Sequence, residues 1–465
     1  MSGMSRFRMG VVCLALLLEG MSASGINVQI GAVRAELAVP QVELQLVASA
    51  FLIAYAGLLP IAGSLADRLD RRRVFLIGIA LFGVGCAVCA AAPGGELLVA
   101  GRFVQGAGAA LSAPAALALI TAGLPEGGDR NRAVALYGAM GAVGFSLGLV
   151  VPGAVVTFAG WRASFLVSLP VVALVLAATW SVRVPGGGRG GRPDLLGAVL
   201  LTAALMLAVH LVGAVGALPP AALAIEAALA VAAVVWLVAR GGVRGFPRAV
   251  VASPRVRAAC LALGGAFAAV VASMYALSLG LVEREAATAL LVALLILPQP
   301  IAFSLGAGLG ARLVTRFGPP RVFAAGAAVL AASLAWLAAA GLAAPPWLGV
   351  LPAMAGVGGS LALCFPAASV GAVDATPPEL RATTAGLLTT AQNVGGALGI
   401  ALVTTAGLVP APGNELGIGP AMLLSAAFAI VGAAGAALVL ALGVRRAAHA
   451  ARGAHRLRAG EEAAR

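Results

Sequence analysis

Long apolar stretches, separated by short polar segments, make up most of this chain. Hydrophobic residues account for 61% of its 465 residues and charged residues for 10%, whereas soluble domains are about 45–50% apolar and about 25% charged. No water-soluble fold could cover so much apolar surface, so we expect lipid to surround most of the chain. A helix needs about 20 apolar residues to cross the hydrocarbon of a bilayer. We predict about fourteen such spans: 9–33, 42–62, 74–92, 97–121, 133–157, 163–182, 195–216, 220–239, 256–281, 287–311, 322–341, 347–373, 384–408 and 420–443.

Arginine alone supplies the positive side chains, because the sequence has no lysine. A net charge of +13 would suit a nucleic-acid-binding protein. The arginines, however, lie in short segments between apolar stretches, as in the cytoplasmic loops of membrane proteins. With both termini in the cytoplasm, the outer loops would hold only Arg34, Arg162 and Arg284. We therefore predict that orientation and no nucleic-acid partner.

A sequence repeat relates the two halves of the chain. The segment 63–73 follows the second predicted span, the segment 311–321 follows the tenth, and the two align without gaps. Such duplication is typical of transporters in which two related bundles rock about a central site. The predicted domains are an N-terminal six-span bundle (1–183), two extra spans with flanking loops (184–247), a C-terminal six-span bundle (248–443) and a basic cytoplasmic tail (444–465).

Four local patterns have a fixed place relative to the predicted spans. They are the segment 63–73, Leu98-x-x-x-Arg102-x-x-Gln105-Gly106 in the fourth span, Gly144 to Gly153 in the fifth, and Gly160-Trp161-Arg162 before the sixth. In these patterns the chain resembles the major facilitator superfamily, specifically its fourteen-span drug/proton antiporter branch. It departs from the family at Asp70, where the family has glycine, and at Phe145 and Leu149, where the family has prolines. The resemblance implies an all-α membrane protein with two six-helix bundles plus two additional central spans, in the bacterial cytoplasmic membrane.

Glu19 is the most informative single residue. It lies about ten residues into the first span, roughly 15 Å along a helix. An ionisable group at that depth costs at least a few kcal/mol and marks a candidate functional site. Desolvation favours its neutral form, so this carboxyl could load a proton on one side of the membrane and release it on the other. The resemblance agrees, since several drug/proton antiporters have an acid at midspan in this helix. The alternative is a structural acid bonded to neighbouring polar groups.

Arg102 lies within the fourth span, where the same cost applies to its guanidinium. A buried guanidinium demands a partner. We expect none from its own helix, so the partner would come from another span or from solvent. In the family this arginine is linked to proton transfer, which makes Arg102 the second proton-coupling candidate. The alternative is a structural bond to backbone carbonyls and waters.

The repeated segments contain the residues that we expect to control the exchange between conformations. Contacts that exist in only one conformation set the population of that conformation. The alternative is that these charges only anchor the topology of the chain. The predicted gating residues are Gly63, Asp67, Arg68, Arg71, Arg72, Arg316 and Gly318.

The fifth span carries small residues at helical spacing, which would let another helix approach closely. By resemblance, Gly144, Gly148, Pro152 and Gly153 belong to the helix that carries the antiporter motif. Five further side chains could line the substrate cavity, although each could equally join neighbouring helices. They are Met21, Asn27, Gln105, Gln392 and Asn393.

Together these features predict a secondary active transporter that exports small amphipathic or lipophilic compounds in exchange for protons by alternating access. Its partners would be the small-molecule substrate, protons and the lipid bilayer. A membrane enzyme would need clustered histidines or acids, so we predict no catalytic residue, metal or cofactor. A phosphate-binding loop needs a lysine, so we do not expect ATP as a partner. The alternative function is an exporter or uniporter of one dedicated metabolite.

Overall fold

The computed structural model describes residues 6–68, 70–123, 128–180, 194–215, 218–239, 248–341, 343–377, 380–407, 418–435 and 437. Within these residues the regular secondary structure is helical, without strands. Twelve helical runs in this part of the chain are long and apolar enough to cross a membrane. The prediction of an all-α membrane protein is thus confirmed.

One of the twelve runs, Arg132–Thr179, is 48 residues long. Gly160 interrupts it with φ 82° and ψ 165°, so the chain bends there. Glycine suits this position because other residues rarely adopt a positive φ. A shorter apolar helix, Gly419–Gly435, lies near the end of the described chain. Among the described residues, length and composition therefore give twelve candidate spans, two fewer than the fourteen predicted.

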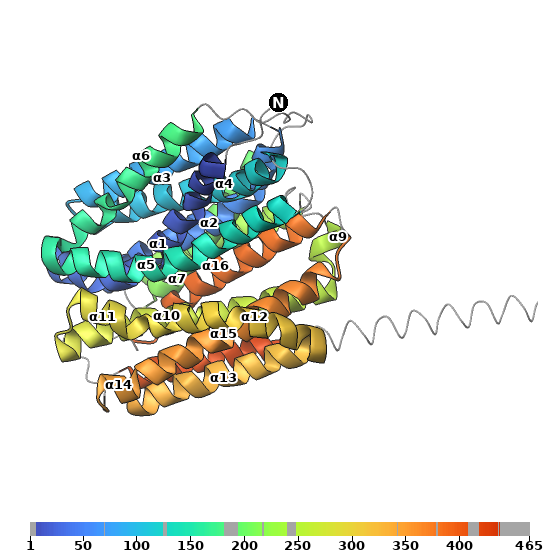
Figure 1. The fold of residues 1–465 in the computed structure, drawn as a ribbon. Helices are drawn as coiled ribbons and strands as arrows, with labels where there is room; N and C mark the ends of the chain where they lie inside the picture. The colour runs from blue at the N-terminus through green and yellow to red at the C-terminus, as the bar shows by residue number, and fades with distance from the viewer. Residues whose placement is uncertain are drawn as a thin grey trace, which may run out of the picture.

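The first six labelled helices form one group, which we call the N-terminal group (Figure 1). In it α1 packs on α5, while α4 packs on both α2 and α3. The bounds of the six helices are α1 Arg6–Leu37, α2 Gln41–Arg68, α3 Arg71–Ala91, α4 Gly95–Gly123, α5 Gly128–Leu166 and α6 Ser168–Thr179.

The later helices form a C-terminal group, drawn in yellow to red in Figure 1. Here α10 packs on α16, and α15 packs on both α12 and α13, in the same pattern of pairs as the N-terminal group. The group contains α9 Arg248–Val251, α10 Pro254–Glu285, α11 Ala289–Ile296, α12 Pro298–Phe317, α13 Pro319–Ala340, α14 Pro346–Gly349, α15 Leu351–Val373, α16 Arg381–Thr405 and the Gly419–Gly435 helix.

Two helices lie between the groups in sequence, α7 (Leu195–Gly213) and α8 (Pro220–Ala239). Helix α7 packs on α2 of the N-terminal group and on α16 of the C-terminal group. Its carbonyls accept hydrogen bonds from both, since Gln45 donates to Val209 (3.1 Å) and Thr405 donates to Val212. Helix α8 packs on α7 and exposes most of its apolar side chains. His210 Nδ1 and Glu226 Oε2, 2.9 Å apart, join the two helices.

Candidate functional site

Glu19 lies where three helices of the N-terminal group meet. Its side chain projects from α1 and is 6% exposed. Carboxylate atom Oε1 accepts a hydrogen bond from Ser112 Oγ on α4 at 3.0 Å, and Oε2 accepts one from Tyr55 Oη on α2 at 3.3 Å. Both carboxylate oxygens of this buried acid therefore have a donor, which offsets part of the cost of taking it out of water.

Arg102 on α4 is 1% exposed and reaches across to α1 and α2. Its guanidinium donates to Ser22 Oγ at 2.8 Å and to the Val47 carbonyl at 3.4 Å. It also donates to Gln105 Oε1 at 2.6 Å. The expectation that no partner would come from its own helix is therefore wrong, because Gln105 lies three residues further along α4, on the same face. Among the described residues, the hydrogen-bond acceptors of Arg102 are all neutral.

Aromatic side chains of α2 separate Arg102 from Glu19. The guanidinium carbon of Arg102 lies 4.9 Å from the centre of the Phe51 ring, a cation–π distance. The Phe51 ring stacks on the Tyr55 ring with 6.1 Å between centroids, and Tyr55 is bonded to Glu19. The two ionisable residues that the sequence singles out thus lie on either side of one aromatic pair.

A small polar cavity lies beside Arg102. Its volume is about 10 Å³, room for about one water molecule. Four predicted site residues line it, namely Met21, Arg102, Gln105 and Pro152. The structure therefore brings together residues that the sequence assigned to three different roles.

The glycines of α5 bring it close to α1, as the sequence predicts. A Cβ atom added at Gly148 would lie 2.5 Å from the Met21 Cα, closer than real Cβ contacts. Gly153 lies instead against Ala289 and Ala293 of α11, at a crossing between the N-terminal and C-terminal groups. Gly20, the glycine of α1 that faces α5, was not predicted, because one glycine in an apolar helix gives no signal.

The two repeated segments lie at helix junctions rather than in loops. Helix α2 continues to Arg68 and α3 begins at Arg71, so the predicted loop 63–73 is mostly helical. Asp70, which departs from the family pattern, caps α3, because its side chain accepts a hydrogen bond from the Arg72 backbone N–H at 3.0 Å. Arg72 also lies 6.0 Å from the centre of the Trp180 ring. The side chains of Gly63, Asp67 and Arg68 lie outside the described residues.

The second copy ends its helix differently. Gly318, with φ 81°, stands between α12 and α13, where a positive φ requires glycine. Arg316 lies 5.1 Å from the centre of the neighbouring Phe317 ring. In both copies, therefore, one helix ends and the next begins within a few residues, with an arginine close to the junction.

Two predicted cavity residues bond within their own helices. The Asn27 amide donates to the Ser24 carbonyl at 3.0 Å, and the Asn393 amide donates to the Thr389 carbonyl at 2.8 Å. Gln392, next to Asn393 on α16, is partly exposed. None of the three lines the cavity beside Arg102.

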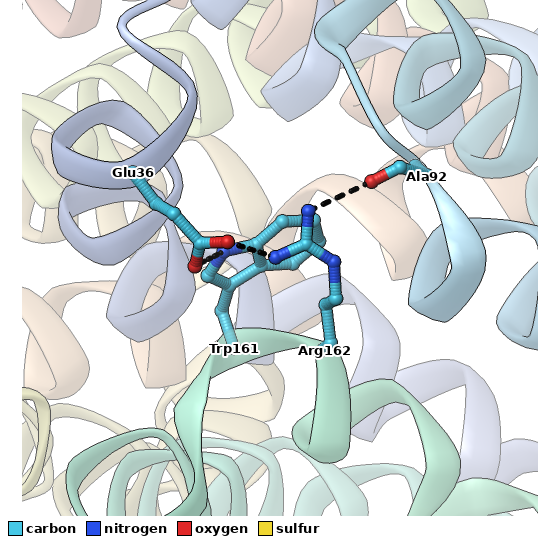
Figure 2. A network of polar contacts seen from close by, with 4 residues as sticks. All are labelled: Glu36, Ala92, Trp161 and Arg162. Carbon is cyan, nitrogen blue, oxygen red and sulfur yellow. Dashed lines mark hydrogen bonds and ion pairs between the residues drawn. The ribbon is translucent and has the colours of Figure 1, made fainter.

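A polar cluster at the Leu37 end of the N-terminal group was not predicted (Figure 2). Glu36 accepts hydrogen bonds from the indole N–H of Trp161 at 2.7 Å and from Arg162. Arg162 also donates to the Ala92 carbonyl at 3.0 Å, so the cluster joins the ends of α1 and α3 to the bend of α5. The motif Gly160-Trp161-Arg162 was recognised, but its acidic partner lies far away in sequence.

Some contacts between the two groups occur at the same end, whereas α2 and α16 pack together further along, where Thr390 donates to the Ala56 carbonyl at 3.4 Å. Arg34 of α1 and Glu283 of α10 form an ion pair at 3.4 Å. The Leu290 backbone N–H of α11 donates to Thr157 Oγ1 of α5 at 3.0 Å. In the sequence these are ordinary residues of loops and helix ends. Nothing in the sequence indicated that they would contact one another.

A larger cavity of about 470 Å³ lies inside the C-terminal group, between α10, α13, α15 and the Gly419–Gly435 helix. Its lining is mostly alanine, proline and phenylalanine, with Arg255 and Asp374 as charged residues. No predicted site residue lines it. Among the described residues, no group of three or more His, Cys, Asp or Glu is placed to hold a metal ion.

Comparison with known proteins agrees with a membrane transporter built from two helical groups. Residues 12–400 match the model of the Major Facilitator Superfamily, and the chain belongs to this family. It is therefore a multi-span membrane transporter and not an enzyme.

Its relatives include resistance proteins. The chain is 29% identical to the methylenomycin A resistance protein of Bacillus subtilis, over 66% of this chain and 67% of the relative. It is 28% identical to the multidrug resistance protein Stp of Mycobacterium tuberculosis, over 84% of this chain and 73% of the relative. Several other resistance and export proteins match over less than half of their own length. Among solved structures, the POT family transporter PepTSo has a similar fold, with a TM-score of 0.69 and 15% sequence identity. The match covers 94% of this chain and 98% of that one.

Proposed function

We propose that the protein exports small amphipathic or lipophilic compounds in exchange for protons by alternating access. The observation that carries the proposal is Glu19, a buried carboxyl in a transporter, with one hydrogen-bond donor on each oxygen. Such a group can exist with or without its proton, which is what coupling requires. Relatives named for resistance to methylenomycin A and to multiple drugs support export of drug-like compounds.

We further propose that the chain crosses the membrane fourteen times, as six plus two plus six spans. A straight helix of 48 residues would be about 72 Å long, more than twice the roughly 30 Å of hydrocarbon. The run Arg132–Thr179 therefore suits two crossings joined at the bend of Gly160. The apolar Gly419–Gly435 helix would supply the last crossing. With the arginine distribution, this gives two cytoplasmic termini in a bacterial cytoplasmic membrane.

In that orientation the ion pair between Arg34 and Glu283 lies on the outer side. The turns that contain Arg71, Arg72, Arg316 and Gly318 lie at the opposite, cytoplasmic ends of their helices. These residues would then act as gates, because a contact available in only one conformation stabilises that conformation. Arg102 with Gln105 would hold α1, α2 and α4 together around the proton site.

Glu19→Gln tests the proposal. Purified protein in liposomes with an imposed pH gradient should accumulate a cationic dye or a lipophilic antibiotic, and Glu19→Gln should abolish that accumulation. It should still exchange labelled for unlabelled substrate, which needs no net proton movement. Glu226→Gln is the matched control, since Glu226 is a helical glutamate that bonds to His210 away from the site. Retained gradient-driven accumulation by Glu19→Gln contradicts the proposal.

The second candidate is an exporter or uniporter of one dedicated metabolite. It is favoured by the relative named for resistance to one compound, methylenomycin A. A panel of unrelated dyes and antibiotics separates the two functions, because a dedicated exporter would move one member of the panel. Substrate movement that a protonophore leaves unchanged would identify a uniporter.

A further inference from the structure

Ser112, one of the two hydrogen-bond donors to Glu19, has a second acceptor within reach. Ser112 Oγ lies 3.0 Å from Glu19 Oε1 and 3.2 Å from the Ala109 carbonyl oxygen of its own helix. A hydroxyl has only one hydrogen, so it can donate to one of these acceptors at a time, while its lone pairs can also accept. Ser112 is fully buried, so no water replaces a bond that it loses.

This geometry satisfies both protonation states of the carboxyl. When Glu19 is ionised, Ser112 donates to Oε1. When Oε1 carries a proton, the carboxylic acid donates to Ser112 Oγ and the hydroxyl turns its own hydrogen towards the Ala109 carbonyl. Rotation about one side-chain bond is enough, so neither state leaves a buried polar atom of this pair unsatisfied.

Tyr55 differs from Ser112 in its exposure. Of the three bonded side chains, Glu19 and Ser112 are buried and only Tyr55 is partly exposed. Its hydroxyl lies on the Oε2 side of the carboxyl, 3.3 Å away. A proton that arrives at Tyr55 Oη can bind there as the original hydroxyl proton passes to Oε2. Rotation of the carboxyl about its Cγ–Cδ bond then exchanges the two oxygens and brings the protonated one to Ser112 Oγ. Release follows the reverse order. The number of protons is conserved in each step.

We propose that Ser112 is a positioning residue that keeps Glu19 hydrogen-bonded in both protonation states, and that protons reach Glu19 through Tyr55. The inference rests on the proposed function, because it assumes that Glu19 takes up and releases a proton during transport.

Few other titratable groups surround this carboxyl. Tyr137 of α5 and Cys13 of α1 lie within electrostatic range of the Glu19–Tyr55 pair, and Arg102 of α4 lies beyond Phe51. Helices α6 and α11 contain no titratable residue. On α10, the titratable side chains Tyr275 and Glu283 lie near Arg34 of α1. Arg34 is about four helical turns from Glu19 along α1. The arrangement leaves Tyr55 as the titratable group bonded directly to the carboxyl.

Two matched pairs of variants test the inference. Ser112→Ala removes the hydroxyl bonded to Glu19, whereas Ser49→Ala removes an equally buried hydroxyl that bonds only to the Gln45 carbonyl. Tyr55→Phe removes the phenol bonded to Glu19, whereas Tyr137→Phe removes one that donates to the Ala113 carbonyl at 2.9 Å. The measurements are the pH profile of gradient-driven dye uptake in liposomes, dye exchange without a gradient, and thermal stability.

We expect Ser112→Ala to shift the midpoint of the pH profile upward by about one pH unit, because the ionised carboxylate loses a donor. Tyr55→Phe should lose most gradient-driven uptake and keep exchange. Ser49→Ala and Tyr137→Phe should match the unmodified protein in both assays. If Ser112→Ala and Tyr55→Phe behave like their controls while Glu19→Gln still abolishes coupling, the inference is wrong and the proposed function stands. If Glu19→Gln leaves coupling intact, both fail.

A variant that misfolds is recognised from its stability. For a variant that folds but transports too little dye to measure, proton release on adding dye to the detergent-purified protein replaces the transport assay. If Ser112→Ala releases protons with the same pH midpoint as the unmodified protein, the proposed role of Ser112 is wrong. A pH midpoint shifted upward supports that role.

Discussion

The crossing of α1 and α5 gives a sharp prediction, because a single methyl group has no room there. A Cβ atom added at Gly144 would lie 2.3 Å from the Leu17 carbonyl oxygen and 2.7 Å from the Leu17 Cα. Ordinary Cβ contacts begin near 3.4 Å. Since both contacts are with backbone, no side chain can turn aside. Gly144→Ala therefore requires α1 and α5 to move apart by about 1 Å.

The expected loss of stability follows from two opposing effects. Overpacking a close contact costs about 1–3 kcal/mol, while alanine stabilises a helix by up to about 1 kcal/mol relative to glycine. The net loss for Gly144→Ala is therefore about 1–2 kcal/mol. The same separation would displace Met21 of α1 and Pro152 of α5, which face each other around the cavity beside Arg102. We expect lower transport as well as lower stability.

Gly138→Ala is the matched control for this prediction. Gly138 lies on the same helix, is exposed, and has no atom within 4 Å of an added Cβ. Thermal unfolding of both purified variants in one detergent, with dye transport in liposomes, makes the comparison. We expect a lower unfolding temperature, by a few degrees, for Gly144→Ala alone. Equal unfolding temperatures and equal transport for the two variants would show that α1 and α5 do not cross this closely.

Two further predictions concern charged side chains. Arg34→Glu would place two acids opposite each other where α1 meets α10, so the conformation closed at that end should lose up to about 1 kcal/mol of stability. The labelling rate of a cysteine introduced near this pair should therefore rise. Adding Glu283→Arg, which restores opposite charges, should reverse the rise. Arg102→Lys keeps the charge but loses the planar guanidinium, whose Nη1 donates to Ser22 and Gln105 and whose Nε donates to the Val47 carbonyl. Gradient-driven transport should therefore fall at least tenfold in a protein that still inserts, and unchanged transport would mean that charge alone is sufficient.

How far the sequence could predict this site depended on how unusual each residue is in an apolar helix. Glu19, Arg102 and Gln105 stand out because ionisable and amide side chains are costly in hydrocarbon, and all three lie buried among polar partners. Ser112 and Tyr55 do not stand out, because hydroxyl groups are common in membrane helices. Their importance comes only from the atoms that face them.

The pairing of helices also escaped sequence reasoning. An amphipathic helix shows which face is buried, but helices that are apolar all round do not. Glu36 illustrates the difficulty, because it is an ordinary charged residue near a helix end until the fold brings it to Arg162, next to the bend at Gly160. The repeat of 63–73 and 311–321 could be recognised by alignment alone, whereas the role of Asp70 as a helix cap needed the backbone.

The two ionisable residues found by sequence are linked by residues that sequence could not find. Arg102 contacts the face of Phe51, Phe51 stacks on Tyr55, and Tyr55 donates to Glu19. All the intervening side chains belong to α2, which also packs on α16 of the C-terminal group and on α7. A movement of α2 relative to α1 and α4 would therefore change the surroundings of both ionisable residues at once. This shared dependence on one helix is the physical connection between the proton site and the relative position of the two groups.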